Sequence, residues 1–173
     1  MSRDIWITSD THFSHANILN FKNEDGTPVR DFRSVEEMNE VMIQNWNKVV
    51  KPGDKVYHLG DVFFGNREKF PSLWARLKGQ KRLIVGNHDD IPYLTRGGFF
   101  SKVMMWRKLG EFNLLLTHVP VHESTLHEGR FEGKKIKNVH GHIHTRKSPT
   151  ENHICVCVEQ TEYTPINIDS LRD

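Results

Sequence analysis

Cysteine is scarce in this sequence. Its two cysteines, Cys155 and Cys157, lie two positions apart in the segment HICVCVE. Two cysteines are too few for a framework of disulfide bonds, and on a strand they would share one face at a spacing that disfavours a disulfide between them. We therefore expect both to be small residues of the core.

A surplus of charge of one sign is missing as well. The chain has 24 lysines and arginines against 22 aspartates and glutamates, a formal net charge of +2. Nucleic-acid-binding proteins usually carry a basic surface, so nucleic acid is not an expected partner. No apolar run approaches the length of a membrane span, and the first residues lack a signal-peptide pattern. We expect a cytoplasmic protein with no membrane partner; these features leave its oligomeric state open.

The overall composition is that of an ordinary folded protein. Hydrophobic residues make up 36% and charged residues 27% of the 173 residues. This balance is typical of a chain that buries a core of its own. Because no repeat, low-complexity segment or linker divides it, we expect one domain over residues 1–173.

The order of the predicted elements favours a mixed α/β fold. Apolar runs and turn residues predict strands at 4–10, 55–59, 82–85, 102–109, 112–118, 137–142 and 153–159. Helical spacing and breakers predict helices at 14–21, 34–50, 67–77 and 92–96, with a helical turn at 167–171. Ser34 and Glu37 form a capping box at the start of the long helix. Early strands alternate with helices and later strands follow one another, which indicates helices packed on sheets.

Potential metal ligands follow several of these strands in five clusters. They are Asp10-Thr-His12, Gly60-Asp61, Gly86-Asn87-His88-Asp89, Thr117-His118 and Gly141-His142-Ile143-His144. Each cluster alone is more typical of a turn or a helix cap. Together and in this order, they resemble the signature D-x-H, G-D, G-N-H-[DE], H, G-H-x-H of the calcineurin-like metallophosphoesterase superfamily. The resemblance runs from Asp10 to His144 and extends to the small single-domain bacterial and phage members.

The resemblance implies a fold and a site. The fold is a sandwich of mixed β-sheets flanked by helices, in four layers α/β/β/α. The site holds two adjacent divalent metal ions. The first ion would be bound by Asp10, His12, Asp61 and His144. The second would be bound by Asp61, Asn87, His118 and His142, so that Asp61 bridges the two.

Two further residues receive catalytic roles from the resemblance. His88 would face the substrate, and Asp89 would orient the His88 ring. The implied reaction is the hydrolysis of a phosphoester by attack of a metal-bridging hydroxide. We favour a phosphodiesterase acting on a small nucleotide-like substrate. A phosphomonoesterase, a nuclease on the same site and a non-catalytic interaction module with the same fold remain alternatives.

The residue types and their spacing agree with such a site on physical grounds. Residues two apart in an extended segment point the same way, so Asp10 can converge with His12, and His142 with His144. Carboxylate, amide and imidazole ligands suit manganese first, with iron, nickel or zinc possible, and the lack of thiolates argues against structural zinc. His140, which also alternates with His142, is expected to be structural or to support a metal ligand from behind.

Residues that would recognise the substrate are less clearly marked. Arg30 and Arg33 flank DF before the long helix and could clamp a phosphate, although two solvated arginines fit the pattern equally well. His15 and Asn17 follow His12 closely enough to line the same cleft, with helix capping or surface roles as the alternative. The four tryptophans lie in apolar periodic contexts and are expected in the core: Trp6, Trp46, Trp74 and Trp106.

Overall fold

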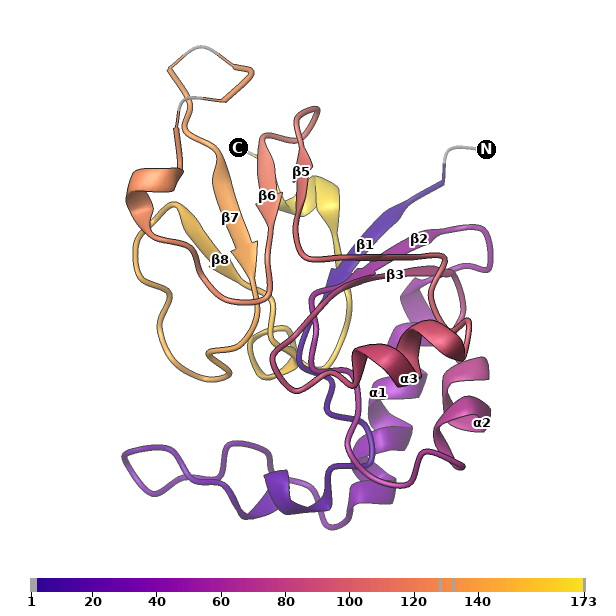
Figure 1. Cartoon of the computed structure of the whole chain (residues 1–173). Helices are drawn as coiled ribbons and strands as arrows, with labels where there is room; N and C mark the ends of the chain where they lie inside the picture. The colour runs from indigo at the N-terminus through magenta and orange to yellow at the C-terminus, as the bar shows by residue number, and fades with distance from the viewer. Residues whose placement is uncertain (1–2, 128, 132, 173) are drawn as a thin grey trace.

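Two β-sheets form the centre of the molecule. The computed structural model describes residues 3–127, 129–131 and 133–172, so the outermost residues of the predicted domain lie outside the described part. The first sheet has the strand order β4-β3-β2-β1-β9 and the second the order β5-β6-β7-β8 (Figure 1). The first sheet consists of β1 (Ile5–Thr8), β2 (Lys55–His58), β3 (Gln80–Ile84), β4 (Lys102–Met104) and β9 (Ile166–Asn167). The second consists of β5 (Arg107–Leu109), β6 (Leu114–Leu116), β7 (Lys137–His140) and β8 (His153–Cys155).

Both sheets are mixed. In the first, β1 to β4 run parallel and β9 pairs antiparallel with β1. In the second, β5 and β6 form the antiparallel pair predicted around Gly110, while β6, β7 and β8 are parallel. The parallel strands β1, β2 and β3 of one sheet and β6 and β7 of the other each lead into a loop that carries predicted ligands. The expected class, mixed sheets flanked by helices, is confirmed.

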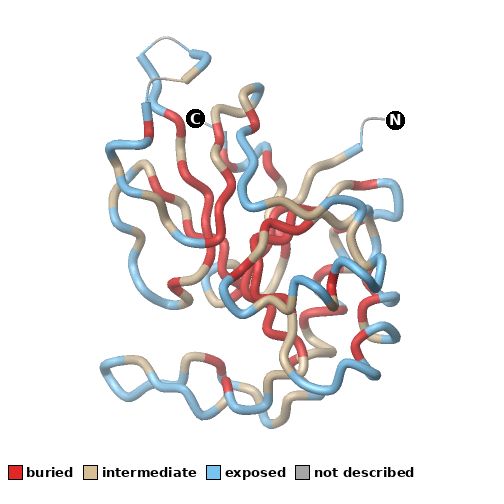
Figure 2. The backbone as a smooth tube through the Cα atoms, viewed as in Figure 1, coloured by how far each residue is buried: buried red, intermediate tan, exposed pale blue. Residues whose placement is uncertain are grey.

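The apolar residues of the strands face two separate cores. Val56 and Leu83 pack with the helices, whereas their neighbours Tyr57 and Ile84 pack with residues of the second sheet such as Leu116. This alternation follows from the period of two in a strand that is covered on both faces. Figure 2 shows the buried residues concentrated along these central strands.

Three α-helices accompany the first sheet: α1 (Val35–Val49), α2 (Phe70–Ala75) and α3 (Ile91–Arg96). The Ser34 hydroxyl accepts a hydrogen bond from the Glu37 amide at 3.1 Å, as the capping box predicts. Four 3-10 turns complete the described elements: η1 (Ala16–Asn20), η2 (Glu123–Thr125), η3 (Val158–Gln160) and η4 (Ile168–Leu171). In the described part of the chain the second sheet is bordered by such turns, so the fourth layer implied by the resemblance is not built of α-helix there. None of the described helices is long and apolar enough to span a membrane.

Several predicted elements differ from the structure. The strand expected at 153–159 ends at Cys155 and is followed by η3, and the helix expected at 14–21 is the 3-10 turn η1. The helix expected at 67–77 covers only 70–75, with Pro71 in its first turn, where the missing amide proton needs no partner within the helix. The single strand expected at 102–109 is two strands, β4 and β5, that belong to different sheets. Met105 and Trp106 form the crossover between them and are 69% and 62% exposed, so Trp106 is not the core residue that its sequence context predicts.

Candidate metal centre

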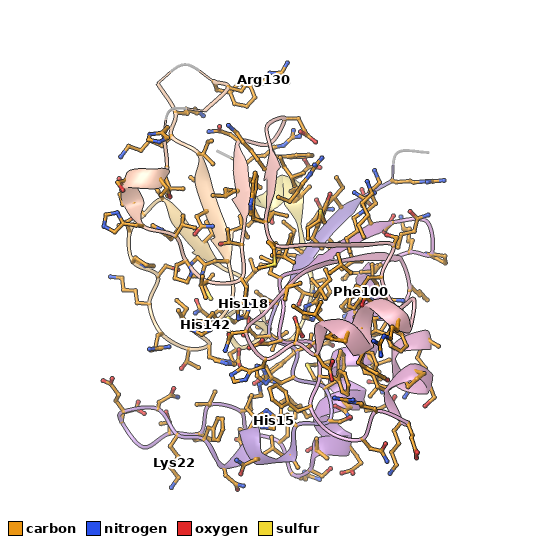
Figure 3. All side chains as sticks on the ribbon, viewed as in Figure 1. His15, Lys22, Phe100, His118, Arg130 and His142 are labelled. Atoms are coloured by element: carbon orange, nitrogen blue, oxygen red, sulfur yellow. The ribbon has the colours of Figure 1, made fainter. Side chains whose placement is uncertain are left out.

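The predicted ligands lie in loops that follow five strand ends. Asp10 and His12 come after β1, Asp61 after β2, Asn87 after β3, His118 after β6, and His142 and His144 after β7. The loops are tied to one another through their backbones, since the amides of Asp10, His12 and Gly141 donate to the carbonyls of Gly60, Asp61 and His118. Figure 3 shows His118 and His142 side by side below the second sheet, with His15 beneath them. The structure therefore brings the predicted ligands, which are spread from Asp10 to His144 along the chain, into one site.

A first ligand group consists of Asp10, His12 and His144, whose ligand atoms all lie within 4.8 Å of one another. Asp10 Oδ1 is 3.8 Å from His12 Nε2 and 3.9 Å from His144 Nε2. The other oxygen, Asp10 Oδ2, accepts hydrogen bonds from the Ser9 hydroxyl at 2.5 Å and the His142 amide at 2.9 Å. One oxygen of Asp10 is thus held by the protein, and the other faces two imidazole nitrogens.

A second ligand group consists of Asn87, His118 and His142. Asn87 Oδ1 lies 2.8 Å from His118 Nε2 and 3.0 Å from His142 Nδ1. The two imidazole rings lie edge to face, with centroids 5.2 Å apart. These three side chains present an amide oxygen and two imidazole nitrogens to one point, which are ligands that a divalent transition metal accepts.

Asp61 lies between the two groups. Its Oδ2 is 3.6 Å from His12 Nε2 and 3.5 Å from His118 Nε2. Its Oδ1 accepts a hydrogen bond from the His88 amide at 3.0 Å. A single anionic oxygen therefore faces a nitrogen of each group, the position required of a ligand shared between two cations.

Hydrogen bonds on the far side of three imidazoles turn the other ring nitrogen towards the site. His118 Nδ1 lies 2.7 Å from the Leu59 carbonyl, and His144 Nδ1 lies 2.8 Å from the Glu159 carboxylate. These oxygens only accept, so the proton of a neutral His144 ring lies on Nδ1 and its Nε2 presents a lone pair. Both nitrogens of His118 face acceptors, since its Nε2 lies against the Asn87 amide oxygen, and a cation between Nε2 and that oxygen would resolve this contact. His12 Nδ1 lies 3.1 Å from His15 Nδ1, which leaves His12 Nε2 for the site.

The electrostatics favour ionised carboxylate and neutral imidazole. Burial alone would raise the pKa of Asp10, but the His12 imidazole and other surrounding groups bring it below its ordinary value. Burial lowers the pKa of His12 and of His142. Burial, together with its neighbour His12, lowers the pKa of His15 to about 4, so that His15 is a neutral acceptor for the His12 proton. His144 differs: burial opposes its charge, but Glu159 raises its pKa above the ordinary value.

The backbone of the site is strained at the ligands themselves. The residues with φ in the left-handed region include Asp10 (56°), His12 (47°), Asp61 (55°), His142 (70°) and His144 (51°). Non-glycine residues adopt this region at a cost that only the surrounding structure can offset, and such residues cluster at functional sites.

Two glycines of the signature lie so close to a carboxylate that no side chain would fit at their positions. A Cβ atom at Gly86 would overlap the Asp61 carboxylate, and one at Gly141 would overlap the Ser9 hydroxyl and the Asp10 carboxylate. Glycine at these two positions therefore lets the loops lie against the carboxylates that they hold.

The site fits divalent metal ions. Asp10 Oδ1 and His12 Nε2 are buried without a hydrogen-bond partner in the described residues. Leaving buried polar atoms unpaired is costly, and a cation between them would satisfy both. The set of carboxylates, imidazoles and one amide oxygen matches the preferences of borderline divalent ions.

Of the residues predicted to face the substrate, some lie near the ligands and others do not. His88 is exposed, with its ring centroid 6.4 Å from that of His12 and 5.3 Å from that of Phe64. The His15 ring stacks on Phe64 with centroids 4.3 Å apart. Asn17 and Arg33 are exposed, and no hydrogen bond joins either side chain to a predicted ligand in the described part of the chain.

Arg30 does not have the predicted role of a phosphate clamp. Its side chain is 1% exposed, and its guanidinium donates to the carbonyls of Asp10 and Thr11 and to the Glu159 carboxylate. These contacts use the guanidinium to hold the loop that carries Asp10 and His12. Arg30 is a structural residue behind the first ligand group.

Asp89 also differs from its predicted pairing with the His88 ring. Its carboxylate accepts hydrogen bonds from the amides of Asp61, Val62 and Gly86, at 3.1, 2.9 and 2.8 Å. No hydrogen bond between Asp89 and the His88 ring is found among the described residues. Asp89 therefore clamps the Asp61 loop to the loop that carries Asn87 and His88.

Comparisons with known proteins identify the family of the chain. The sequence model of the family of calcineurin-like phosphoesterases matches residues 3–168. The chain is a member of this family. The resemblance predicted from the motifs is thereby confirmed, and the calcineurin-like phosphoesterases act on phosphoesters.

Several proteins are similar to this calcineurin-like phosphoesterase. The uncharacterized protein MJ1445 of Methanocaldococcus jannaschii is 35% identical over 96% of this chain and 88% of that protein. The gene 66 protein of Mycobacterium phage D29 is 30% identical over 83% of this chain and 79% of that protein. The crystal structure of the protein of unknown function AQ665 from Aquifex aeolicus has a TM-score of 0.73 at 27% identity and covers 98% of both chains.

Sequence reasoning missed three residues that support the ligands of this calcineurin-like phosphoesterase. Glu159 is buried and joins His144 to Arg30; the Cys157 thiol lies 3.4 Å from Asp10 Oδ2; and Ser9 donates to the same oxygen. The position of Ser9 directly before Asp10 was a usable signal. Nothing in the sequence connects Glu159 or Cys157 with ligands far away along the chain, although both cysteines are buried as predicted.

Proposed function

We propose that the chain is a phosphodiesterase with two metal ions that hydrolyses a small nucleotide-like phosphodiester. One observation carries the proposal: Asp61 Oδ2 lies at nearly equal distances, 3.6 and 3.5 Å, from a nitrogen of each ligand group. Two cations held close together repel strongly, and an anionic oxygen shared between them offsets that repulsion. Asp10, His12, Asp61 and His144 would hold one ion, and Asp61, Asn87, His118 and His142 the other.

The protein's own residues would bind and orient the ester around these ions. When bound, the ions would supply Lewis acidity, which lowers the pKa of a water molecule towards about 7 and offsets the charge on the phosphoryl oxygens. His88 is exposed above the site, and its amide is held by Asp61. Its imidazole is the group that would donate a proton to the leaving oxygen, worth about 10²–10⁴ in rate. Asp89 would act as a positioning residue, because it holds the backbone of this loop.

Manganese is the metal that we propose, because the ligands combine hard oxygens with imidazoles and include no thiolate. A cytoplasmic location and a small phosphoester as the substrate also belong to the proposal. The near-balanced charge of the chain supports a small substrate over nucleic acid.

The decisive experiment strips the protein with a chelator, restores Mn²⁺, and measures hydrolysis of bis-4-nitrophenyl phosphate and of 4-nitrophenyl phosphate. We expect metal-dependent turnover with a higher kcat/KM for the diester. His88→Ala should lower kcat about 10²-fold or more while the protein still binds metal, whereas His127→Ala, at an exposed histidine outside the signature, should behave as the parent.

Each other result would redirect the proposal. A preference for the monoester would make the chain a phosphomonoesterase, and turnover of single-stranded DNA alone would make it a nuclease. Two bound ions without turnover of any of these esters would contradict this substrate class. Absence of metal binding would leave a non-catalytic module with the same fold.

A further inference from the structure

An apolar cleft opens directly beside the second ligand group. It has a volume of about 720 Å³, and its lining includes Asn87 and His118 together with Ile91, Met105 and Trp106. Asn87 and His118 thus belong both to the wall of the cleft and to the candidate metal centre. The cleft is therefore continuous with the place where a phosphoryl group would bind.

Exposed apolar side chains are concentrated in this cleft. Six large hydrophobic residues of the described chain are exposed, and four of them line it: Ile91 (41%), Met105 (69%), Trp106 (62%) and Val119 (46%). Singly exposed apolar residues need no explanation, but a contiguous group of them marks a binding surface. Met105 and Trp106 come from the crossover between β4 and β5, so the exposure arises where the chain passes from one sheet to the other.

The opposite side of the metal centre has different chemistry. A second cleft of about 690 Å³ lies beside His144 and has a mixed lining, in which apolar residues such as Phe21 and Ile143 alternate with charged ones such as Asp25 and Arg146. A charged or strongly hydrated ester group would be favoured there and disfavoured against the apolar wall, because burying an unpaired polar group is costly. The apolar cleft therefore selects an apolar or aromatic group.

The position of His88 indicates which ester group this is. His88 does not line the apolar cleft, and its ring lies near Phe64 and His12, on the side of the first ligand group. A leaving oxygen that receives its proton from His88 points to that side. The retained ester group lies off the axis that joins the attacking oxygen, phosphorus and the leaving oxygen, so it is free to point away from His88, to the apolar cleft beside Asn87 and His118.

We propose that the cleft between Asn87 and Trp106 is a subsite for an aromatic ester group that the phosphodiester retains after cleavage. The inference rests on the proposed function and names the substrate class: a diester with one flat aromatic substituent. Trp106 supplies the ring against which such a group stacks, and Met105 adapts to its edge. A phosphomonoester has no second ester group and leaves the subsite empty.

The test keeps the leaving group constant and varies the retained group. Phenyl 4-nitrophenyl phosphate and methyl 4-nitrophenyl phosphate are compared by kcat/KM on the Mn²⁺-loaded protein. We expect the phenyl ester to be preferred roughly tenfold, because the methyl group fills little of the cleft. Trp106→Ala should reduce the preference to about twofold through KM and leave the methyl ester unaffected.

Matched variants test whether a change in the preference comes from the cleft itself or from a general effect of truncating an exposed side chain. Trp106 is exposed, so its truncation is not expected to disturb folding, and Met105→Ala should reduce the preference in the same direction. Phe131→Ala, at an exposed aromatic residue in a different cleft, should keep the parent ratio. An unchanged ratio in Trp106→Ala and Met105→Ala would overturn the proposal and leave the apolar cleft to a protein partner.

A binding measurement separates failure of the subsite from failure of the proposed function. Diphenyl phosphate and dimethyl phosphate are titrated calorimetrically into the Mn²⁺-loaded parent and Trp106→Ala. We expect diphenyl phosphate to bind the parent about tenfold more tightly than dimethyl phosphate and to lose that advantage in the variant. If no ester is hydrolysed but this preference holds, the proposed function fails and the subsite stands; equal binding of both compounds overturns the subsite.

Discussion

The two ligand groups are built in different ways. In the first group, Asp10 and His12 are 0% and 4% exposed, and His15, Glu159, Ser9 and Arg30 hold its members from behind. In the second group His118 is 5% exposed, but Asn87 is exposed, and His142 is half-buried like His144 of the first group. The amide oxygen of Asn87 is the point at which its two imidazoles meet.

This difference predicts unequal metal sites. Ligands whose orientation is already held by hydrogen bonds lose little entropy when an ion binds, so the first group should bind its ion more tightly. The second group opens onto the apolar cleft and should exchange its ion more readily. Asp61 should couple the two, because one of its oxygens faces both groups.

The largest effect should come from Asp61→Asn. The variant replaces the shared anionic oxygen by a neutral amide and removes the charge that offsets repulsion between two cations. We expect one bound ion per chain by elemental analysis in place of two, and a loss of Mn²⁺-dependent turnover of at least about 10³-fold. Two retained ions with turnover within tenfold of the parent would contradict the bridging position.

Asn87→Ala should affect the second group alone. The side chain that both His118 and His142 contact is removed, while Asp10, His12 and His144 keep their partners. In a calorimetric titration with Mn²⁺ we expect the weaker binding event to weaken further by about 10²-fold and the tighter one to stay within about twofold. An equal change in both events would mean that the two groups are not independent.

Glu159→Gln should affect the first group by a smaller amount. The amide keeps an oxygen for His144 but loses the negative charge that raises the pKa of His144 and pairs with Arg30. Loss of such an outer partner typically costs about 10- to 100-fold in metal affinity, and we expect the lower part of that range, in the tighter binding event. Glu151→Gln, at an exposed glutamate, is the matched control and should leave both events unchanged. A weakening confined to the other event would reverse the assignment of the groups.

Much of the fold could be predicted from local sequence. The Ser34 cap, the helix that follows it and the hairpin at Gly110 are present as predicted, because each depends on contacts between residues close in sequence. The segment 102–109 shows the limit. Its apolar pattern is that of one strand, but whether residues pair with β3 or with β6 depends on partners distant in sequence. Trp106 is exposed for the same reason.

For the candidate site, too, local motifs were predictable from sequence and long-range contacts were not. The identity and order of the potential ligands, from Asp10 to His144, could be recognised from sequence because the signature consists of short local motifs. The roles of Arg30 and Asp89 could not, since both side chains act on backbone groups that the fold brings to them.

By itself, the sequence determined which side chains could bind metal and that the chain is a calcineurin-like phosphoesterase, because spacing within a motif already restricts where its side chains can point. Only the tertiary structure decided that Glu159 supports His144, that Asp61 lies between two groups, and that Trp106 borders a cleft beside Asn87. These relations join strand ends from two different sheets. Their distances follow from how the sheets pack, and no local pattern of residues encodes that packing.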